Sequence, residues 1–166
     1  SGSVGVEGGA IVRTAAARLE EALKRTPGIH YRTAVFPDAA GRGPMLASEW
    51  ETPPGGSRRV LASIPSRGPT PITQTLLWSL FSLGNRPEPT KLLILFTDGV
   101  FAADDCRAEE GALKLAGIET AAVLLNLHQT APGRRLFEEE TRVVRNAAEI
   151  PLALLDVLRD WRRRHP

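Results

Sequence analysis

The chain has 166 residues, of which 42% are hydrophobic and 24% charged, with a formal net charge of only +2. This length and composition are typical of one globular domain and exclude a disordered or fibrous protein. Because the net charge is small and no apolar run approaches the roughly 20 residues that span a bilayer, we expect a soluble, cytoplasmic protein without a nucleic-acid or membrane partner.

The first half of the chain predicts a helix followed by short strands. Apolar residues recur at helical spacing from Ala10 to Lys24, and Pro27-Gly28 ends that helix. Residues Ile29–Phe36 alternate in the manner of a strand. An edge strand is expected over Leu46–Thr52 and a short helix over Ser57–Ile64.

The second half predicts a βαβ unit. Leu92–Phe96 is a continuous apolar run, typical of a strand buried on both faces. Asp104 or Asp105 can cap a helix that runs to Ala116 and is closed by Gly117. Ile118–Leu125 is a second apolar strand, which should run parallel to the first.

Three further elements complete an α/β pattern. A helix over Ile72–Leu83 stops at Gly84 and carries Trp78 and Phe81 as core candidates. Val143 and Val144 predict a short strand, and Ile150–Arg163 a last helix. Strands that alternate with helices predict an α/β domain of three layers.

Three segments carry candidate chemistry. Ser1-Gly2-Ser3 precedes the first helix, Gly68-Pro69-Thr70-Pro71 precedes the helix at Ile72, and Thr97-Asp98-Gly99 follows a buried strand. Taken singly, they can be a flexible start, a helix cap and a turn. Asp98, however, lies at the carboxyl end of a strand, where open α/β sheets bind ligands.

Together the three segments resemble the von Willebrand factor A (vWA) family in order and rough spacing. Its metal-ion-dependent adhesion site is written Asp-x-Ser-x-Ser, then a loop threonine, then an aspartate in a Thr-Asp-Gly turn. The resemblance implies that Ser1, Ser3, Thr70 and Asp98 are metal ligands. It also implies a Rossmann-like fold, in which helices flank a mostly parallel central sheet, over a single domain spanning residues 1–166.

The sequence departs from the family at its start. The first aspartate of the motif belongs two positions before Ser1, and the strand that carries it is missing too. We therefore expect the domain to be incomplete at its N-terminus. Val4 also stands where the family commonly has methionine.

The ligand set implied by the resemblance favours binding over catalysis. Hydroxyl and carboxylate oxygens suit Mg²⁺, or alternatively Mn²⁺ or Ca²⁺. Neutral hydroxyl ligands leave the ion electrophilic, so an open position can accept an acidic residue from a protein partner. This chemistry needs no general base and no nucleophile, and we expect no enzyme activity.

Other site types lack a necessary residue. An Asp-x-Asp-Gly phosphatase motif would place its nucleophile at Phe96. The glycines of Gly5–Gly9 lack the Gly-Lys-Ser/Thr of a phosphate loop, and the single Cys106 excludes a cysteine metal cluster. His30, His128 and His165 lack metal-ligand spacing. The basic tail Arg159–His165 is either a contact surface or a solvated helix end.

The resemblance leaves three hypotheses about function. The first is a metal-dependent protein-interaction module, because intracellular bacterial members often work beside AAA+ ATPases. The second is a non-catalytic accessory subunit of an ATP-driven metal chelatase or of a MoxR-type AAA+ complex. The third is a scaffold whose metal site is vestigial.

Overall fold

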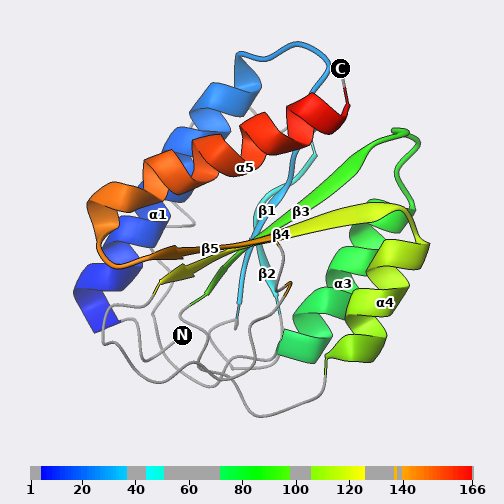
Figure 1. The fold of residues 1–166 in the computed structure, drawn as a ribbon, viewed down its shortest axis with the longest axis horizontal. Coiled ribbons are helices and arrows are strands. Elements are labelled where there is room, and N and C mark those ends of the chain that lie inside the picture. The colour runs from blue at the N-terminus through cyan, green and yellow to red at the C-terminus, as the bar shows by residue number, and fades with distance from the viewer. Residues whose placement is uncertain are drawn as a thin grey trace. The chain divides into compact units, whose positions relative to one another are not determined.

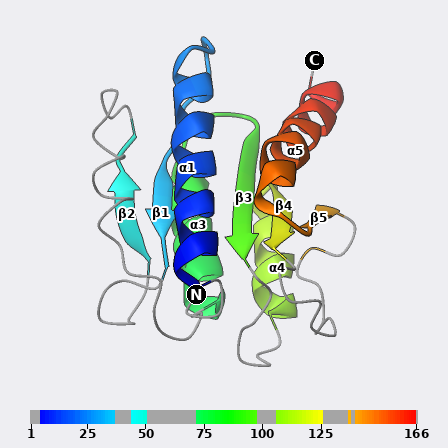
Figure 2. The same ribbon diagram turned by 90° about the vertical axis from the view of Figure 1, so that its left-hand side faces the viewer.

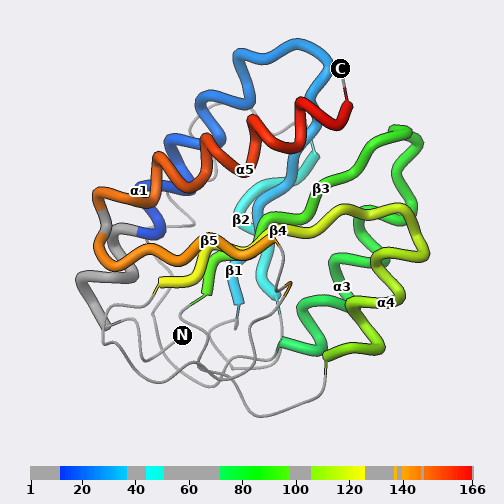
Figure 3. Tube along the Cα trace, viewed as in Figure 1, coloured from blue at the N-terminus to red at the C-terminus, as the bar shows by residue number. Residues whose placement is uncertain are grey.

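The computed structural model describes residues 5–36, 44–50, 72–97, 106–125, 137 and 140–165 (Figures 1 and 3). The chain divides into two compact units, Ser1–Pro71 and Ile72–Pro166, and each is considered by itself. Within these ranges, no helix combines the length and the apolar content that crossing a bilayer requires. The short helix predicted over residues 57–64 lies outside the described residues.

The first unit contains a helix and an antiparallel pair of strands. Helix α1 (Gly5–Lys24) begins earlier than predicted and ends where predicted. Strand β1 (Thr33–Val35) pairs with β2 (Met45–Ser48). Both strands are shorter than predicted, and the register shifts between Thr33 and Ala34. The shift arises where the Thr33 N–H donates to the Ser48 hydroxyl at 2.9 Å.

A turn connects α1 to β1. Pro27 and Gly28 do not cap the helix, which has already ended at Lys24. Instead the Ile29 N–H bonds the Thr26 carbonyl at 3.4 Å, and Gly28 has φ +77°. This is the geometry of a type II turn, in which proline fits the second position and glycine the third.

A buried carboxylate ties α1 to the strand pair. Glu20 on α1 and Ser48 on β2 are both only 4% exposed. The Ser48 hydroxyl donates to Glu20 Oε1 at 3.3 Å and accepts the Thr33 N–H. A buried carboxylate without hydrogen bonds is costly, so the burial of Glu20 depends on its hydrogen bond from Ser48. This hydrogen bond forms only when α1 packs on the strand pair.

The second unit contains a parallel sheet with strand order β3-β4-β5. This confirms the predicted βαβ unit and the α/β class. The elements are α3 (Ile72–Gly84), β3 (Lys91–Thr97), α4 (Arg107–Leu115), β4 (Ile118–Leu125), β5 (Thr141–Val144), a 3₁₀ turn η3 (Ala147–Glu149) and α5 (Ile150–Arg164).

Helices cover both faces of this sheet. Figure 1 shows α5 on one side of the strands and α3 with α4 on the other, and all three helices contact β4. The consecutive residues Ala121, Ala122 and Val123 of β4 are each at most 2% exposed. Neighbouring residues of a strand point to opposite faces, so β4 is buried on both. Strand β3 is less buried than predicted, because only Leu95 and Thr97 are fully covered.

The start of α4 differs from the prediction. Its first backbone bond runs from the Glu110 N–H to the Cys106 carbonyl at 2.9 Å, which makes Cys106 the N-cap. The predicted caps Asp104 and Asp105 are therefore wrong, and they lie outside the described residues. The end is as predicted, since Gly117 adopts φ +68° and its N–H bonds the Lys114 carbonyl.

The predicted core face of α3 is partly wrong. Of the two core candidates, Phe81 is 68% exposed and Trp78 is half-buried. The buried residues of the helix are Ile72, Thr75, Leu76 and Ser79. The physical reason is that the Ser79 hydroxyl donates to the Thr75 carbonyl at 2.8 Å. A small polar residue whose hydroxyl bonds a carbonyl of its own helix can be buried at little cost. The polar residues Thr75 and Ser79 therefore did not indicate, from sequence, that their side of α3 is buried.

Two leucines of α4 allow a matched test of the core. Leu113 is fully buried and Leu115 is 92% exposed. We expect Leu113→Ala to lower the free energy of unfolding by about 2–5 kcal/mol, because the substitution leaves a cavity. Leu115→Ala should change it by less than about 0.5 kcal/mol. Urea denaturation followed by circular dichroism measures both, and equal effects would contradict this packing.

Two glycines allow a test of backbone conformation. Gly117→Ala forces a side chain into the left-handed region at φ +68° and should destabilise the protein by about 1 kcal/mol. Gly111 lies within α4 with nothing within 4 Å of an added Cβ. Gly111→Ala should therefore stabilise the protein by about 0.5–1 kcal/mol. Thermal unfolding of the two variants should move the midpoint in opposite directions.

Candidate functional site

The four predicted metal ligands lie outside the described residues. These are Ser1, Ser3, Thr70 and Asp98. The structure therefore neither brings them together nor separates them. It does describe the elements that adjoin them in sequence, because α1 begins at Gly5, α3 begins at Ile72 and β3 ends at Thr97.

In the second unit, the starts of two helices and the ends of two strands share one edge. Figure 2 shows α3 and α4 beginning where β3 and β4 finish. A side-chain contact links the two helix starts, since Thr73 Oγ1 lies 4.0 Å from Cys106 Sγ. Ile72 and Cys106 are 1% and 2% exposed, so these starts are packed into the core. Parallel pairing of β3 with β4 fixes this edge.

The sequence neighbours of Thr70 and Asp98 are thus firmly held. Thr97, which precedes Asp98, is only 7% exposed. Thr73, three residues after Thr70 in the sequence, is held against Cys106. The segment that contains Asp98 therefore starts at the buried end of β3 and finishes at a residue in contact with α3.

The electrostatics of this edge favour negative charge. Two helices begin there, and a helix N-terminus carries a partial positive charge. The first turn of α4 contains Glu109 and Glu110, whereas the first turn of α3 has no acidic residue. A cation at this edge therefore needs a carboxylate ligand close to it, and the carboxylate that the sequence predicts is Asp98.

No alternative metal centre is found in the part of the chain that the structure describes. There, no group of three or more histidine, cysteine, aspartate or glutamate residues is arranged to hold an ion. Cys106 is a buried thiol at the start of α4. His30 is exposed, and His128 lies outside the described residues.

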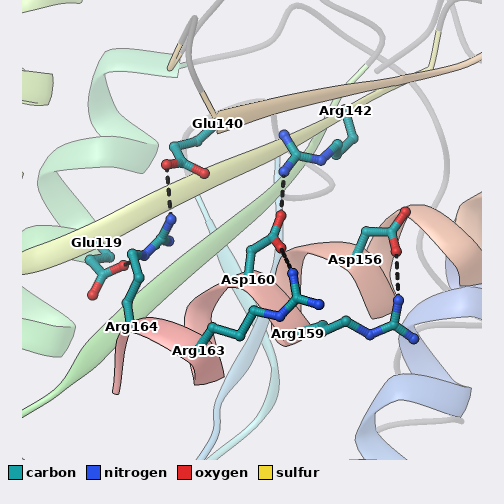
Figure 4. A network of polar contacts seen from close by, with 8 residues as sticks. All are labelled: Glu119, Glu140, Arg142, Asp156, Arg159, Asp160, Arg163 and Arg164. Atoms are coloured by element: carbon teal, nitrogen blue, oxygen red, sulfur yellow. Dashed lines mark hydrogen bonds and ion pairs between the residues drawn. The ribbon is translucent and has the colours of Figure 1, made fainter. Parts of the chain in front are cut away.

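The predicted basic tail contributes to the fold. Arg164, in the last turn of α5, pairs with Glu119 at 2.9 Å and with Glu140 at 3.2 Å (Figure 4). His165 contacts the same Glu119, and its ring lies 5.5 Å from that of Trp161. These contacts fasten the end of α5 to β4 and to the residue before β5.

A further ion pair holds α5 one turn before Arg164. Arg142 Nη2, on β5, lies 2.8 Å from Asp160 Oδ2 (Figure 4). Asp160 and Arg164 are four residues apart and share one side of the helix. This i, i+4 spacing of an acid and a base was visible in the sequence, but the acids that Arg164 meets come from distant segments.

Comparison with known proteins gives no family assignment. The chain matches no protein-family model, and a search of curated proteins returns no match. The vWA resemblance therefore depends on the residues of the three motif segments.

Two arginines of α5 test which charges stabilise the fold. Arg164→Ala should lower the free energy of unfolding by about 1 kcal/mol, because it removes both ion pairs of Arg164, which are only partly exposed, and leaves Glu119 with His165 alone among the described residues. Arg162→Ala, at an exposed position two residues away on the opposite side of the helix, should change it by less than about 0.5 kcal/mol. Denaturant titration at low and high salt checks both values, and the Arg164 effect should shrink with salt.

Proposed function

We propose that the chain is a vWA-type domain of three-layer, Rossmann-like architecture that works as a metal-dependent protein-interaction module. The observation that carries this proposal is the shared edge of the second unit. There the end of β3 and the start of α3, which adjoin Asp98 and Thr70 in sequence, are held by the sheet and by the contact of Thr73 with Cys106.

Chain connectivity supports pairing of these two ligands. Asp98 directly follows Thr97, and Thr70 lies two residues before Ile72. One residue of extended chain spans at most about 3.6 Å, so neither ligand can lie far from its anchored neighbour. The segment Ser1–Ser3 adjoins α1 of the first unit, and its participation depends on the motif alone.

The ligand chemistry supports Mg²⁺ or Mn²⁺ and an acidic partner residue. A shell of two serine hydroxyls, a threonine hydroxyl and one carboxylate leaves the ion with excess positive charge. The partial charges of the two helix starts add to that excess. A glutamate or aspartate of a protein partner would complete the coordination and neutralise it, as expected for a partner such as an AAA+ ATPase.

Titration with Mn²⁺ tests the site directly. Water-proton relaxation, which detects weak binding, should show one Mn²⁺ site on the chain. Asp98→Ala should weaken binding by at least about tenfold, because it removes the one carboxylate of the proposed set. Thr70→Val should weaken it as well, since valine keeps the shape and removes the oxygen.

Asp105→Ala is the matched control. Asp105 lies in the same segment as Asp98, between β3 and α4, but the resemblance gives Asp105 no role in metal binding. The control variant should bind Mn²⁺ like the parent chain. Equal losses for Asp98→Ala and Asp105→Ala would indicate a diffuse charge effect and contradict the proposed ligands. Absence of Mn²⁺ binding by the parent chain would leave the scaffold hypothesis as the better account.

A further inference from the structure

Helix α5 presents a stripe of exposed residues on the side that faces away from the sheet. Its buried side is formed by Ile150, Ala153, Leu154 and Val157. Successive residues of an α-helix are turned by about 100° around its axis. On this projection, five residues opposite the buried side fall within an arc of roughly 100°. We call this surface the α5 stripe, and its exposed members are Leu152, Leu155, Arg159, Arg162 and Arg163.

The first half of the stripe is apolar. Leu152 is 61% exposed and Leu155 is 56% exposed. They lie three residues apart, so their side chains are neighbours on the helix surface. A single exposed leucine is ordinary, but an adjoining pair beside a charged cluster is the pattern of an interface with an apolar centre and a polar rim.

The second half of the stripe is basic and only loosely neutralised. Arg159 lies 3.5 Å from Asp156, and Arg163 lies 3.7 Å from Asp160. These separations exceed the 2.8 Å and 2.9 Å of the pairs made by Arg142 and Arg164. Within the residues that the structure describes, the Arg162 side chain makes no ion pair.

The arginines of α5 therefore divide into two groups with different roles. Arg164 faces the sheet and fastens the helix, as Figure 4 shows, and Arg142 does the same from β5. Arg159, Arg162 and Arg163 are not needed for that attachment. Because the helix is anchored by other contacts, the stripe is preorganised, and a partner does not have to order it on binding.

We propose that the α5 stripe is a docking surface for a protein partner that presents an amphipathic, acidic helix. Two apolar side chains of that helix cover Leu152 and Leu155, and its carboxylates pair with the three stripe arginines. Charge complementarity selects this occupant, since exposed guanidinium groups bind carboxylates through two parallel hydrogen bonds. This surface belongs to the second unit and does not depend on the proposed metal site.

The geometry favours a protein over an anionic membrane. An interfacial membrane helix buries a continuous apolar face in the headgroup region. The apolar face of α5 is already buried, and only the two stripe leucines remain for insertion. The small net charge of +2 adds little attraction to an anionic surface.

A designed peptide tests the proposal. The probe is a fluorescent 16-residue helical peptide with two leucines and three glutamates along one face, and the comparison peptide has glutamine in place of glutamate. Anisotropy should show saturable binding of the acidic peptide to the whole chain and clearly weaker binding of the glutamine peptide. Binding of the acidic peptide should also weaken as salt increases.

Variants locate the binding surface. Arg159→Glu with Arg162→Glu should weaken binding of the acidic peptide at least about tenfold, because attraction becomes repulsion. Leu152→Ser with Leu155→Ser should weaken it at any salt concentration. Arg18→Glu with Arg25→Glu makes the same change of net charge at exposed positions of the first unit and should leave binding unchanged. Circular dichroism melting confirms that each variant is folded.

Three outcomes would overturn the docking surface. They are no binding of the acidic peptide, equal binding of the two peptides, and equal losses in the α5 variants and the Arg18/Arg25 control. Vesicles containing phosphatidylserine form a separate arm. If the chain binds these vesicles through the α5 stripe and does not bind the peptide, the partner is a membrane and the proposal is wrong.

Discussion

Parallel pairing of β3 with β4 is the constraint on which the second unit depends. The register runs from Lys91 opposite Ile118 to Thr97 opposite Leu124. Because the strands are parallel, the chain must return along the sheet between them, and α4 makes that return. The pairing therefore brings the start of α4 to the edge where β3 ends, and the contact of Thr73 with Cys106 adds the start of α3. Any ligand that this unit binds through segments following its strands has to bind at this edge.

Charge has two distinct uses on the last helix. Asp160 and Arg164 are directed toward the sheet and meet partners on β5, on β4 and just before β5. On the opposite side, Arg159 and Arg163 make, among the described residues, only the longer ion pairs within the helix, with Asp156 and Asp160. The sequence shows Arg159–His165 as one basic cluster, whereas the structure separates its arginines into two groups with different contacts. This division also separates two properties experimentally, because substitutions on one side of the helix should change stability and those on the other side should change binding.

Prediction from sequence succeeded where one physical signal was strong. The continuous apolar run of β4 gave its boundaries, and helical spacing gave α3 and α5. It failed where a local contact replaced the usual signal. Ser79 is buried because its hydroxyl is satisfied by its own helix, and Cys106 starts α4 without a side-chain cap bond. The proposed ligands Ser1, Ser3, Thr70 and Asp98 were named from motif order, which gives residue types but no distances.

By itself, the sequence determined the class of the fold, the course of its helices and strands, and the residue types of a candidate cation site. The class and the elements follow from local rules, namely hydrophobic period and turn chemistry, whereas the residue types of the candidate site come only from the resemblance to the vWA family. Only the tertiary structure decided which face of α3 is buried, that Glu20 meets Ser48, and which arginine of α5 pairs with distant segments. Those outcomes depend on which distant segments pack together. Glu119 and Arg164 are 45 residues apart, and no local pattern in the sequence encodes their contact.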